Sequence, residues 1–190
     1  MSAFDKVDMV PMYRSFNWRA ALDNEALPIV TSPFSNINVF LTSKFAFLNE
    51  AYDLSVSRAQ IDNNLHLLLI AYKEFPNRNL VLVSNWSISE YGINLKKEYL
   101  NKYKNIFVVD AIYNKKELDV IRSNTSLYIH SHSRCGTAPS LVEAMNYNIP
   151  IISFDVETNR ITTGNKCLYF SSEFELIDIL KNLDEKTLSK

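Results

Sequence analysis

The segment HSHSRCGTAPSLVEAMN, His130 to Asn146, predicts the end of a strand, a turn and the start of a helix. Gly136 and Thr137 form the turn, and Pro139 stands where the first turn of a helix tolerates proline. The apolar face of this helix consists of Leu141, Val142, Ala144 and Met145. A helix start presents unpaired N–H groups and a partial positive charge. Because Glu143 follows within two turns, we expect a ligand with both an anionic group and a hydroxyl group.

Apolar runs and helical patterns alternate on both sides of this segment. The predicted strands are Tyr52–Val56, Leu80–Ser84, Ile106–Val109, Ser126–His130, Pro150–Phe154 and Leu168–Phe170. Apolar residues three and four positions apart predict the intervening helices. The clearest stripes are Leu65, Leu68, Leu69, Tyr72 and Leu176, Ile177, Leu180, Leu183, and the weaker ones are Tyr91, Leu95, Tyr99 and Leu118, Ile121, Arg122. Strands without polar alternation are buried on both faces, so the pattern predicts an α/β fold with a doubly wound, Rossmann-like parallel sheet.

The first fifty residues break this alternation, and we expect them to form an irregular N-terminal extension. Prolines at positions 11, 28 and 33 interrupt any regular period. Two aromatic-rich segments, 10–18 and 37–47, are candidates for a strand and a helix. The expected organisation is therefore an extension over residues 1–50 and a Rossmann-like domain over residues 51–190.

The composition indicates a soluble protein without a strongly charged surface. Of its 190 residues 47% are hydrophobic, and the formal net charge is −1, so nucleic acid is not an expected partner. No apolar run approaches the roughly 18 residues of a membrane span. The two cysteines make no disulfide framework, and the N-terminus lacks the apolar core of a signal peptide. We expect a cytoplasmic protein without a transmembrane segment, and a peripheral position at the inner membrane face stays open.

Several sequence motifs that carry known chemistries are absent from the chain. It contains no G-x-G-x-x-G fingerprint, no P-loop motif and no G-x-S-x-G nucleophile elbow. It also lacks C-x-x-C and H-E-x-x-H, which are typical of zinc sites, and D-x-D, which clamps a metal-bound diphosphate. We therefore expect neither a metal nor a resident cofactor, and a bound phosphate has to be held by helix N-termini and basic side chains.

The run YIHSHSRCGTAPSLVEAMNYNIPIISFDVETNR, from Tyr128 to Arg160, resembles the C-terminal half-domain of GT-B glycosyltransferases. It most resembles bacterial rhamnosyltransferase-like members of family four, which build capsule and other surface polysaccharides. Upstream, Val56-Ser57-Arg58 and Asp62-Asn63-Asn64 are similar to the first strand, loop and helix of that family. The resemblance covers about residues 52–183.

The resemblance implies an enzyme that binds a nucleotide-diphosphate sugar and transfers a hexosyl or deoxyhexosyl group without a metal. It implies that Arg58 neutralises the diphosphate and that Glu143 hydrogen-bonds a hydroxyl of the nucleotide or of the donor. The implied donor-binding residues are Arg58, His130, His132, Gly136, Thr137, Ser140, Glu143 and Asn159. A catalytic residue cannot be assigned. Arg and a helix N-terminus in a dry cleft are well suited to phosphoryl charge, which agrees with these roles.

The chain departs from the family pattern at several positions, among them Arg134, Ala138 and Asn63, and above all at Cys135 and in size. Cys135 stands where many family-four enzymes have a second glutamate, and with no base identifiable beside it we interpret it as a small filler. Size is the other main departure, because a GT-B enzyme has two Rossmann-like domains and fifty residues cannot form the N-terminal one. The expected partners are a glycan or lipid-linked acceptor and an acceptor domain, which another chain would supply if this one is not an excised domain. A non-catalytic nucleotide-binding module, or a degenerate relic, is the alternative.

Simpler explanations stay open for several of these residues. Glu143 near a helix start also complements the helix dipole, and Arg58 is also a candidate for an ordinary ion pair. Asp155 and Arg160 are expected to pair and to shape a loop that Asn159 caps. Lysines 96, 97, 102 and 104 are interpreted as a solvated helix face rather than a nucleic-acid patch.

Overall fold

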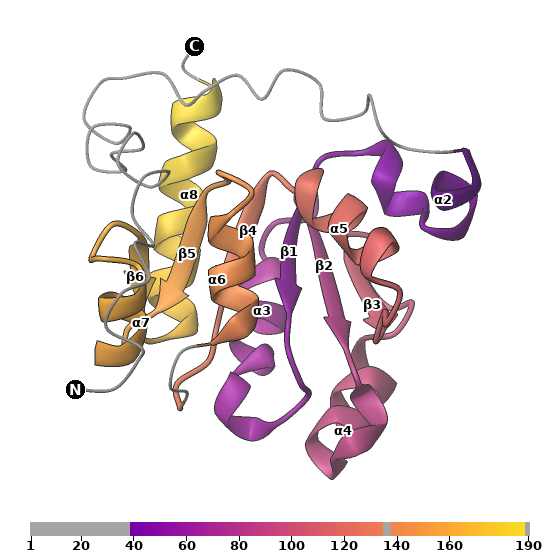
Figure 1. The fold of residues 1–190 in the computed structure, drawn as a ribbon, viewed down its shortest axis with the longest axis horizontal. Coiled ribbons are helices and arrows are strands. Elements are labelled where there is room, and N and C mark those ends of the chain that lie inside the picture. Colours follow the sequence, from indigo (N-terminus) through magenta and orange to yellow (C-terminus); the bar gives the residue numbers. More distant parts are fainter. Residues whose placement is uncertain (1–38, 135–137, 189–190) are drawn as a thin grey trace, which may run out of the picture.

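The computed structural model describes residues 39–134 and 138–188, and its centre is a six-stranded parallel sheet (Figure 1). The strands are β1 (Tyr52–Val56), β2 (Asn79–Ser84), β3 (Ile106–Asp110), β4 (Leu127–His130), β5 (Ile151–Phe154) and β6 (Leu168–Phe170). Their order across the sheet is β3-β2-β1-β4-β5-β6. The order reverses between β1 and β4, which makes the crevice above these two strands the point where a doubly wound sheet opens for ligands.

Helices connect the strands and cover the sheet on both faces. The α-helices are α2 (Val39–Lys44), α3 (Leu65–Tyr72), α4 (Glu90–Tyr99), α5 (Lys115–Ser123), α6 (Pro139–Met145), α7 (Glu157–Thr162) and α8 (Glu173–Leu188). Short 3-10 helices are η3 (Ala46–Asn49), η4 (Ile61–Asn63) and η5 (Trp86–Ile88).

Alternate residues of the strands enter two separate hydrophobic cores. Leu80 and Leu82 of β2 join a core that α3, α4 and α8 cover, whereas Val81 and Val83 join a core that α5 and α6 cover. This alternation is the two-residue period of a strand, and here both sets are apolar because both faces are buried. The prediction of a doubly wound, Rossmann-like α/β fold is therefore confirmed.

The strand boundaries differ from the predicted ones by single residues. Pro150 has no N–H group, so β5 begins at Ile151, while the carbonyl of Pro150 accepts from the Tyr128 amide at 2.8 Å. β4 begins at Leu127 rather than Ser126, and β2 and β3 each gain one polar residue, Asn79 and Asp110. Polar residues at strand ends carry no apolar signal, which explains why the pattern does not include Asn79 and Asp110.

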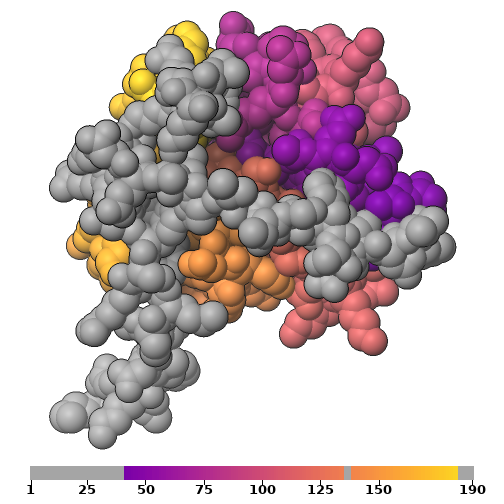
Figure 2. All heavy atoms as spheres, turned by 90° about the horizontal axis from the view of Figure 1, so that it is seen from above, coloured from indigo at the N-terminus to yellow at the C-terminus, as the bar shows by residue number. Residues whose placement is uncertain are grey.

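The segment before β1 packs on the sheet where the structure describes it. Phe47 and Leu48 of η3 are buried in the α5/α6 core, and the Phe47 ring contacts Tyr52 and Phe107. Figure 2 looks onto the edge where the strands begin, and the indigo atoms that follow residue 39 lie at the surface there. The predicted helix at 37–47 corresponds to α2, whereas the predicted strand at 10–18 lies outside the described residues. The domain boundary near residue 50 stays a prediction.

Asparagines occupy the left-handed backbone positions that glycine usually takes. Asn64, Asn101, Asn148 and Asn165 have φ between 50° and 59°, and Gly164, with φ 60°, is the one described glycine in this region. Asparagine tolerates this conformation better than other side chains. A chain with only three glycines therefore still makes its tight turns, and Asn64 makes the one that starts α3.

Candidate functional site

A cavity of about 460 Å³ opens at the carboxyl ends of the strands, above the crevice between β1 and β4. Four of the predicted donor-binding residues line it, namely Arg58, His132, Ser140 and Glu143. They come from the loop after β1, the loop after β4 and the first turns of α6. Residues that follow β2 and β3, among them Asn85 and Tyr113, complete the lining. The fold thus brings together side chains that are up to 85 positions apart in the sequence.

The loops after β1 and β4 are joined by hydrogen bonds that hold the cavity wall. The Asn64 amide donates to the Ser131 carbonyl at 3.0 Å, and the Ser131 hydroxyl donates to the Asn63 carbonyl at 2.5 Å. The Ser133 backbone N–H and hydroxyl both donate to the Asp62 carbonyl, at 2.8 and 2.9 Å. We call these bonds the loop clamp. It fixes the two connections that carry Arg58 and His132.

Arg58 reaches the cavity from the β1 side of the loop clamp. Its carbonyl accepts a 2.6 Å hydrogen bond from the amide of Asn63, which is itself buried. Its side chain is exposed and, among the residues that the structure describes, has no ion-pair partner. The alternative of an ordinary ion pair therefore has no support, and an unpaired guanidinium beside a cavity is available to an anion.

His130 and His132 form a pair of rings in contact, with centroids 4.2 Å apart. Burial and the neighbouring His132 lower the pKa of His130 to about 3. Burial and the charge of Arg58 lower the pKa of His132 to about 4, although Asp62 acts in the opposite direction. Both rings are therefore neutral near pH 7. His130 is 1% exposed and lies behind the cavity rather than in its wall. Neither of its ring nitrogens has a hydrogen-bond partner among the residues that the structure describes.

Glu143 on α6 pairs with Arg122, a residue of α5 that sequence reasoning did not assign to the site. The Arg122 Nη2 lies 2.5 Å from Glu143 Oε2, and the side chain of Glu143 is 49% exposed against 7% for Arg122. Glu143 therefore does more than complement a helix dipole. The sequence does contain one sign of this ion pair. Arg122 stands in an apolar helix stripe with Leu118 and Ile121, and a charged residue on a buried helix face needs a partner of opposite charge.

Ser140 stands in the first turn of α6, next to the buried ring of Tyr128. The Tyr128 hydroxyl donates to the Val56 carbonyl at 3.3 Å and also interacts with the Ser140 side chain. This contact connects the start of α6 to β4 and to the carboxyl end of β1. Two further predicted residues, Gly136 and Thr137, lie outside the described residues.

Asn159 does not reach the cavity. It is 1% exposed on α7, and its amide donates to the carbonyls of His132 and Phe154, each at 3.0 Å. The N-cap of α7 is Val156, and Asn159 lies inside this helix, so the prediction that Asn159 caps a loop is wrong. It ties the loop after β4 to the end of β5 instead. The expected pairing of Asp155 with Arg160 is confirmed, with contacts of 2.5 and 2.7 Å.

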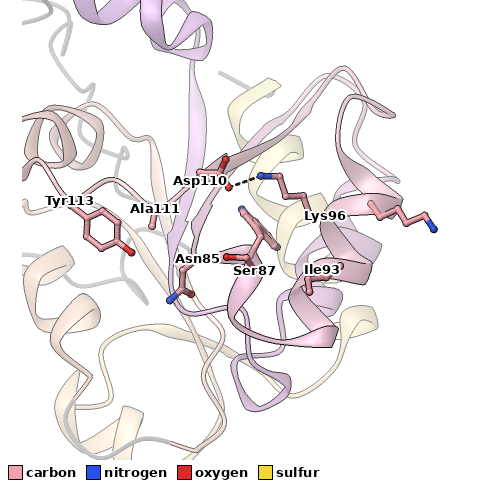
Figure 3. A pocket seen from close by; sticks show the side chains of 9 residues that line it. Asn85, Ser87, Ile93, Lys96, Asp110, Ala111 and Tyr113 are labelled. Atoms are coloured by element: carbon pink, nitrogen blue, oxygen red, sulfur yellow. Dashed lines mark hydrogen bonds and ion pairs between the residues drawn. The ribbon is translucent and has the colours of Figure 1, made fainter.

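A second cavity of about 640 Å³ lies beside the first, between α4 and the end of β3. Asn85, Ala111 and Tyr113 line both cavities. Figure 3 shows the Lys96–Asp110 ion pair on one side of this cavity, with N–O distance 2.5 Å, and Tyr113 on the opposite side. Tyr113 is 88% exposed, which is unusual for an aromatic ring. This exposed ring borders both cavities.

Over residues 39–134 and 138–188, no group of three or more His, Cys, Asp and Glu side chains is arranged to hold a metal ion. In the same part of the chain, no helix is long and apolar enough to cross a membrane.

The sheet order and the cavity at its reversal point define a Rossmann-like domain of the type found in GT-B enzymes. The sequence matches the family described as Glycosyl transferases group 1 over residues 42–166, and the chain belongs to this family. A search of curated proteins finds no match.

Solved structures with the same fold are only distantly similar in sequence. The structure of HepE from Anabaena in complex with UDP-glucose has a TM-score of 0.61 and 13% identity, over 80% of this chain and 45% of that one. For the trehalose-6-phosphate synthase OtsA the values are 0.60 and 11%, over 80% and 39%. The C-terminal domain of a glycosyl transferase group 1 protein from Francisella tularensis, LpcC, gives 0.53 and 12%, over 70% and 75%. The chain spans less than half the length of the first two relatives.

Proposed function

We propose that the 460 Å³ cavity binds a nucleotide-diphosphate sugar, and that this chain is the donor-binding half of a glycosyltransferase. The observation that carries the proposal is the convergence of Arg58, His132, Ser140 and Glu143 on one cavity at the reversal point of the sheet. The family membership supports the same reaction class. Transfer of a hexosyl or deoxyhexosyl group during capsule or other surface polysaccharide synthesis is the specific role we infer, from the rhamnosyltransferase-like segment.

Each wall of the cavity suits one part of such a donor. The unpaired guanidinium of Arg58 meets the diphosphate, whose charge needs no metal when an arginine and a helix start face it. The exposed carboxylate of Glu143 accepts a hydrogen bond from a sugar hydroxyl, and the neutral ring of His132 offers a further polar contact. The ring of Tyr113 gives a nucleobase an aromatic surface on which to stack.

The acceptor side of the reaction requires a second domain, from the same or another polypeptide. Large apolar side chains are exposed in the connections that follow the carboxyl ends of the strands, namely Ile61, Ile88, Tyr113 and Ile161. Of these side chains Tyr113 lines the cavity, so its exposed ring is available for contact with a domain that covers the cavity. We therefore infer that a domain carrying a glycan or lipid-linked acceptor closes over this edge, at the cytoplasmic face of the membrane.

A non-catalytic nucleotide-binding module is the second candidate function. It is favoured by Cys135, which replaces the second glutamate of many family-four enzymes. Under this alternative the cavity still binds a nucleotide, but the complete assembly does not transfer sugar.

Isothermal titration with UDP, GDP, dTDP and their sugars tests the proposal directly. We expect at least one of these ligands to bind, and Arg58→Ala or Glu143→Ala to weaken binding by about 1–3 kcal/mol, the value of a charged hydrogen-bond partner. Lys97→Ala, in the wall of the second cavity only, is the matched control and should leave the affinity unchanged. Absence of binding for every ligand would refute the proposed function, and unchanged affinity in both site variants would refute the residue assignment.

A further inference from the structure

Arg122 is a buried cation at the end of α5, close to the cavity but outside its wall. Its side chain is 7% exposed, and its buried Nε has no hydrogen-bond partner within the described part of the chain. Its Nη2 contacts Glu143 Oε2 at 2.5 Å, whereas the residues that line the cavity do not include it. A guanidinium withdrawn from water needs compensation, and here the partner is the carboxylate that faces the cavity.

The surroundings of Arg122 direct it to Glu143 rather than to the other nearby carboxylate. Asp119 lies one turn earlier on α5, where it could pair with Arg122, but its Oδ1 accepts a hydrogen bond from the Tyr147 hydroxyl at 2.8 Å. The last turn of α5 also favours a cation, because the helix dipole is negative there. The pair therefore joins the rigid end of α5 to the second turn of α6.

We propose that Arg122 is a positioning residue, which fixes the Glu143 carboxylate so that Oε1 faces a ribose hydroxyl of the bound nucleotide. This inference rests on the proposed function. A free glutamate on a helix surface samples several rotamers, and only some of them aim an oxygen into the cavity. With Oε2 held by Arg122, one oxygen remains for the ligand. Arg122 thus acts on the ligand only through Glu143.

The experiment measures affinities for UDP and GDP and for their 2′,3′-dideoxy forms, in wild type, Arg122→Met, Glu143→Gln and the double variant. We expect Arg122→Met to weaken binding of the ribonucleotide about 5–20-fold, close to the loss in Glu143→Gln, and to leave the dideoxy form within about twofold. The double variant should lose no more than either single variant, because both remove the same contact. Arg122→Lys should restore part of the affinity.

Two controls separate positioning from a merely structural role. Lys44→Met removes the other ion pair of α5, with Glu117 at 2.7 Å, and should leave both affinities unchanged. Crystal structures of wild type and Arg122→Met show the Glu143 rotamer without any ligand. We expect one ordered rotamer in wild type and several in the variant.

Equal losses for the ribonucleotide and the dideoxy form, or additive losses in the double variant, would overturn the inference. If wild type binds no nucleotide, the proposed function fails, and the crystal structures still decide the role of Arg122. An unchanged Glu143 rotamer in Arg122→Met would then refute it.

Discussion

Replacing Asn159 by alanine tests whether this residue supports the site from behind or contacts the donor. The substitution removes two 3.0 Å hydrogen bonds, to the carbonyls of His132 and Phe154, from a side chain that is 1% exposed. The His132 carbonyl then loses its donor at a cost of about 1–3 kcal/mol, whereas the Phe154 carbonyl keeps the Val156 N–H at 3.0 Å, so the second lost bond costs only about 0.5–1.5 kcal/mol. Loss of the Asn159 Oδ1, which has no partner among the described residues, returns about 1 kcal/mol. We therefore expect the free energy of unfolding to fall by about 0.5–3.5 kcal/mol.

Urea unfolding followed by circular dichroism measures this change, and a thermal scan should show the melting temperature lowered by roughly 2–4 °C for each kcal/mol lost in a domain of this size. Asn159→Asp keeps the shape but removes both N–H donors, so it should destabilise at least as much as alanine. Thr158→Ala, at the exposed neighbouring position, is the control and should change stability by less than about 0.5 kcal/mol. If Asn159→Ala leaves stability within about 0.5 kcal/mol of wild type but weakens nucleotide binding, our reasoning is refuted and Asn159 is a donor ligand.

Three further predictions concern pH, the cavity rim and helix packing. Burial lowers the pKa values of His130 and His132 to about 3 and 4, so the unfolded chain binds protons below about pH 6.5 while both rings stay neutral in the folded protein. The stability that these neutral rings contribute should therefore be complete at pH 7 and decline between pH 6.5 and 4. Urea titrations of His130→Phe should show a shallower decline. Tyr113→Ala should weaken UDP about 5–50-fold while inorganic pyrophosphate binds as before, and Tyr113→Phe should restore the affinity; an equal loss for pyrophosphate would contradict stacking. Gly92→Ala should destabilise the domain by about 1–3 kcal/mol in urea unfolding, because the new Cβ would lie 2.4 Å from the Trp86 carbonyl oxygen; a neutral substitution would show that α4 moves freely.

The sheet could be predicted from the sequence because its signal is local. Every strand of a doubly wound sheet is a short apolar run, and the two-sided burial of residues such as Leu82 and Val83 is already present in the pattern. The helix after β4 was equally clear from Pro139 and the apolar face that follows it. Local patterns therefore predict the element order and the edge of the sheet at which the cavity opens.

The partners of the polar residues could not be predicted, because they depend on contacts between distant segments. Nothing local distinguishes Asn159, which donates to backbone across 27 positions, from a ligand-binding amide. The same holds for Arg122, whose partner is 21 positions away, and for the depth of His130 behind His132. Arg58, His132, Ser140 and Glu143, to which a motif rather than a pattern of hydropathy pointed, line one cavity, and their role in donor binding stays a prediction.

The loop clamp has a thermodynamic consequence for ligand binding. Loops that become ordered only on binding lose conformational entropy at that step, and part of the interaction energy is consumed by it. Here the chain segments that carry Arg58 and His132 are already tied together through Asp62, Asn64 and the serines after β4, so this ordering is completed during folding. A nucleotide then meets a preorganised surface, and Asn64→Ala should make binding entropically less favourable even though Asn64 touches no ligand.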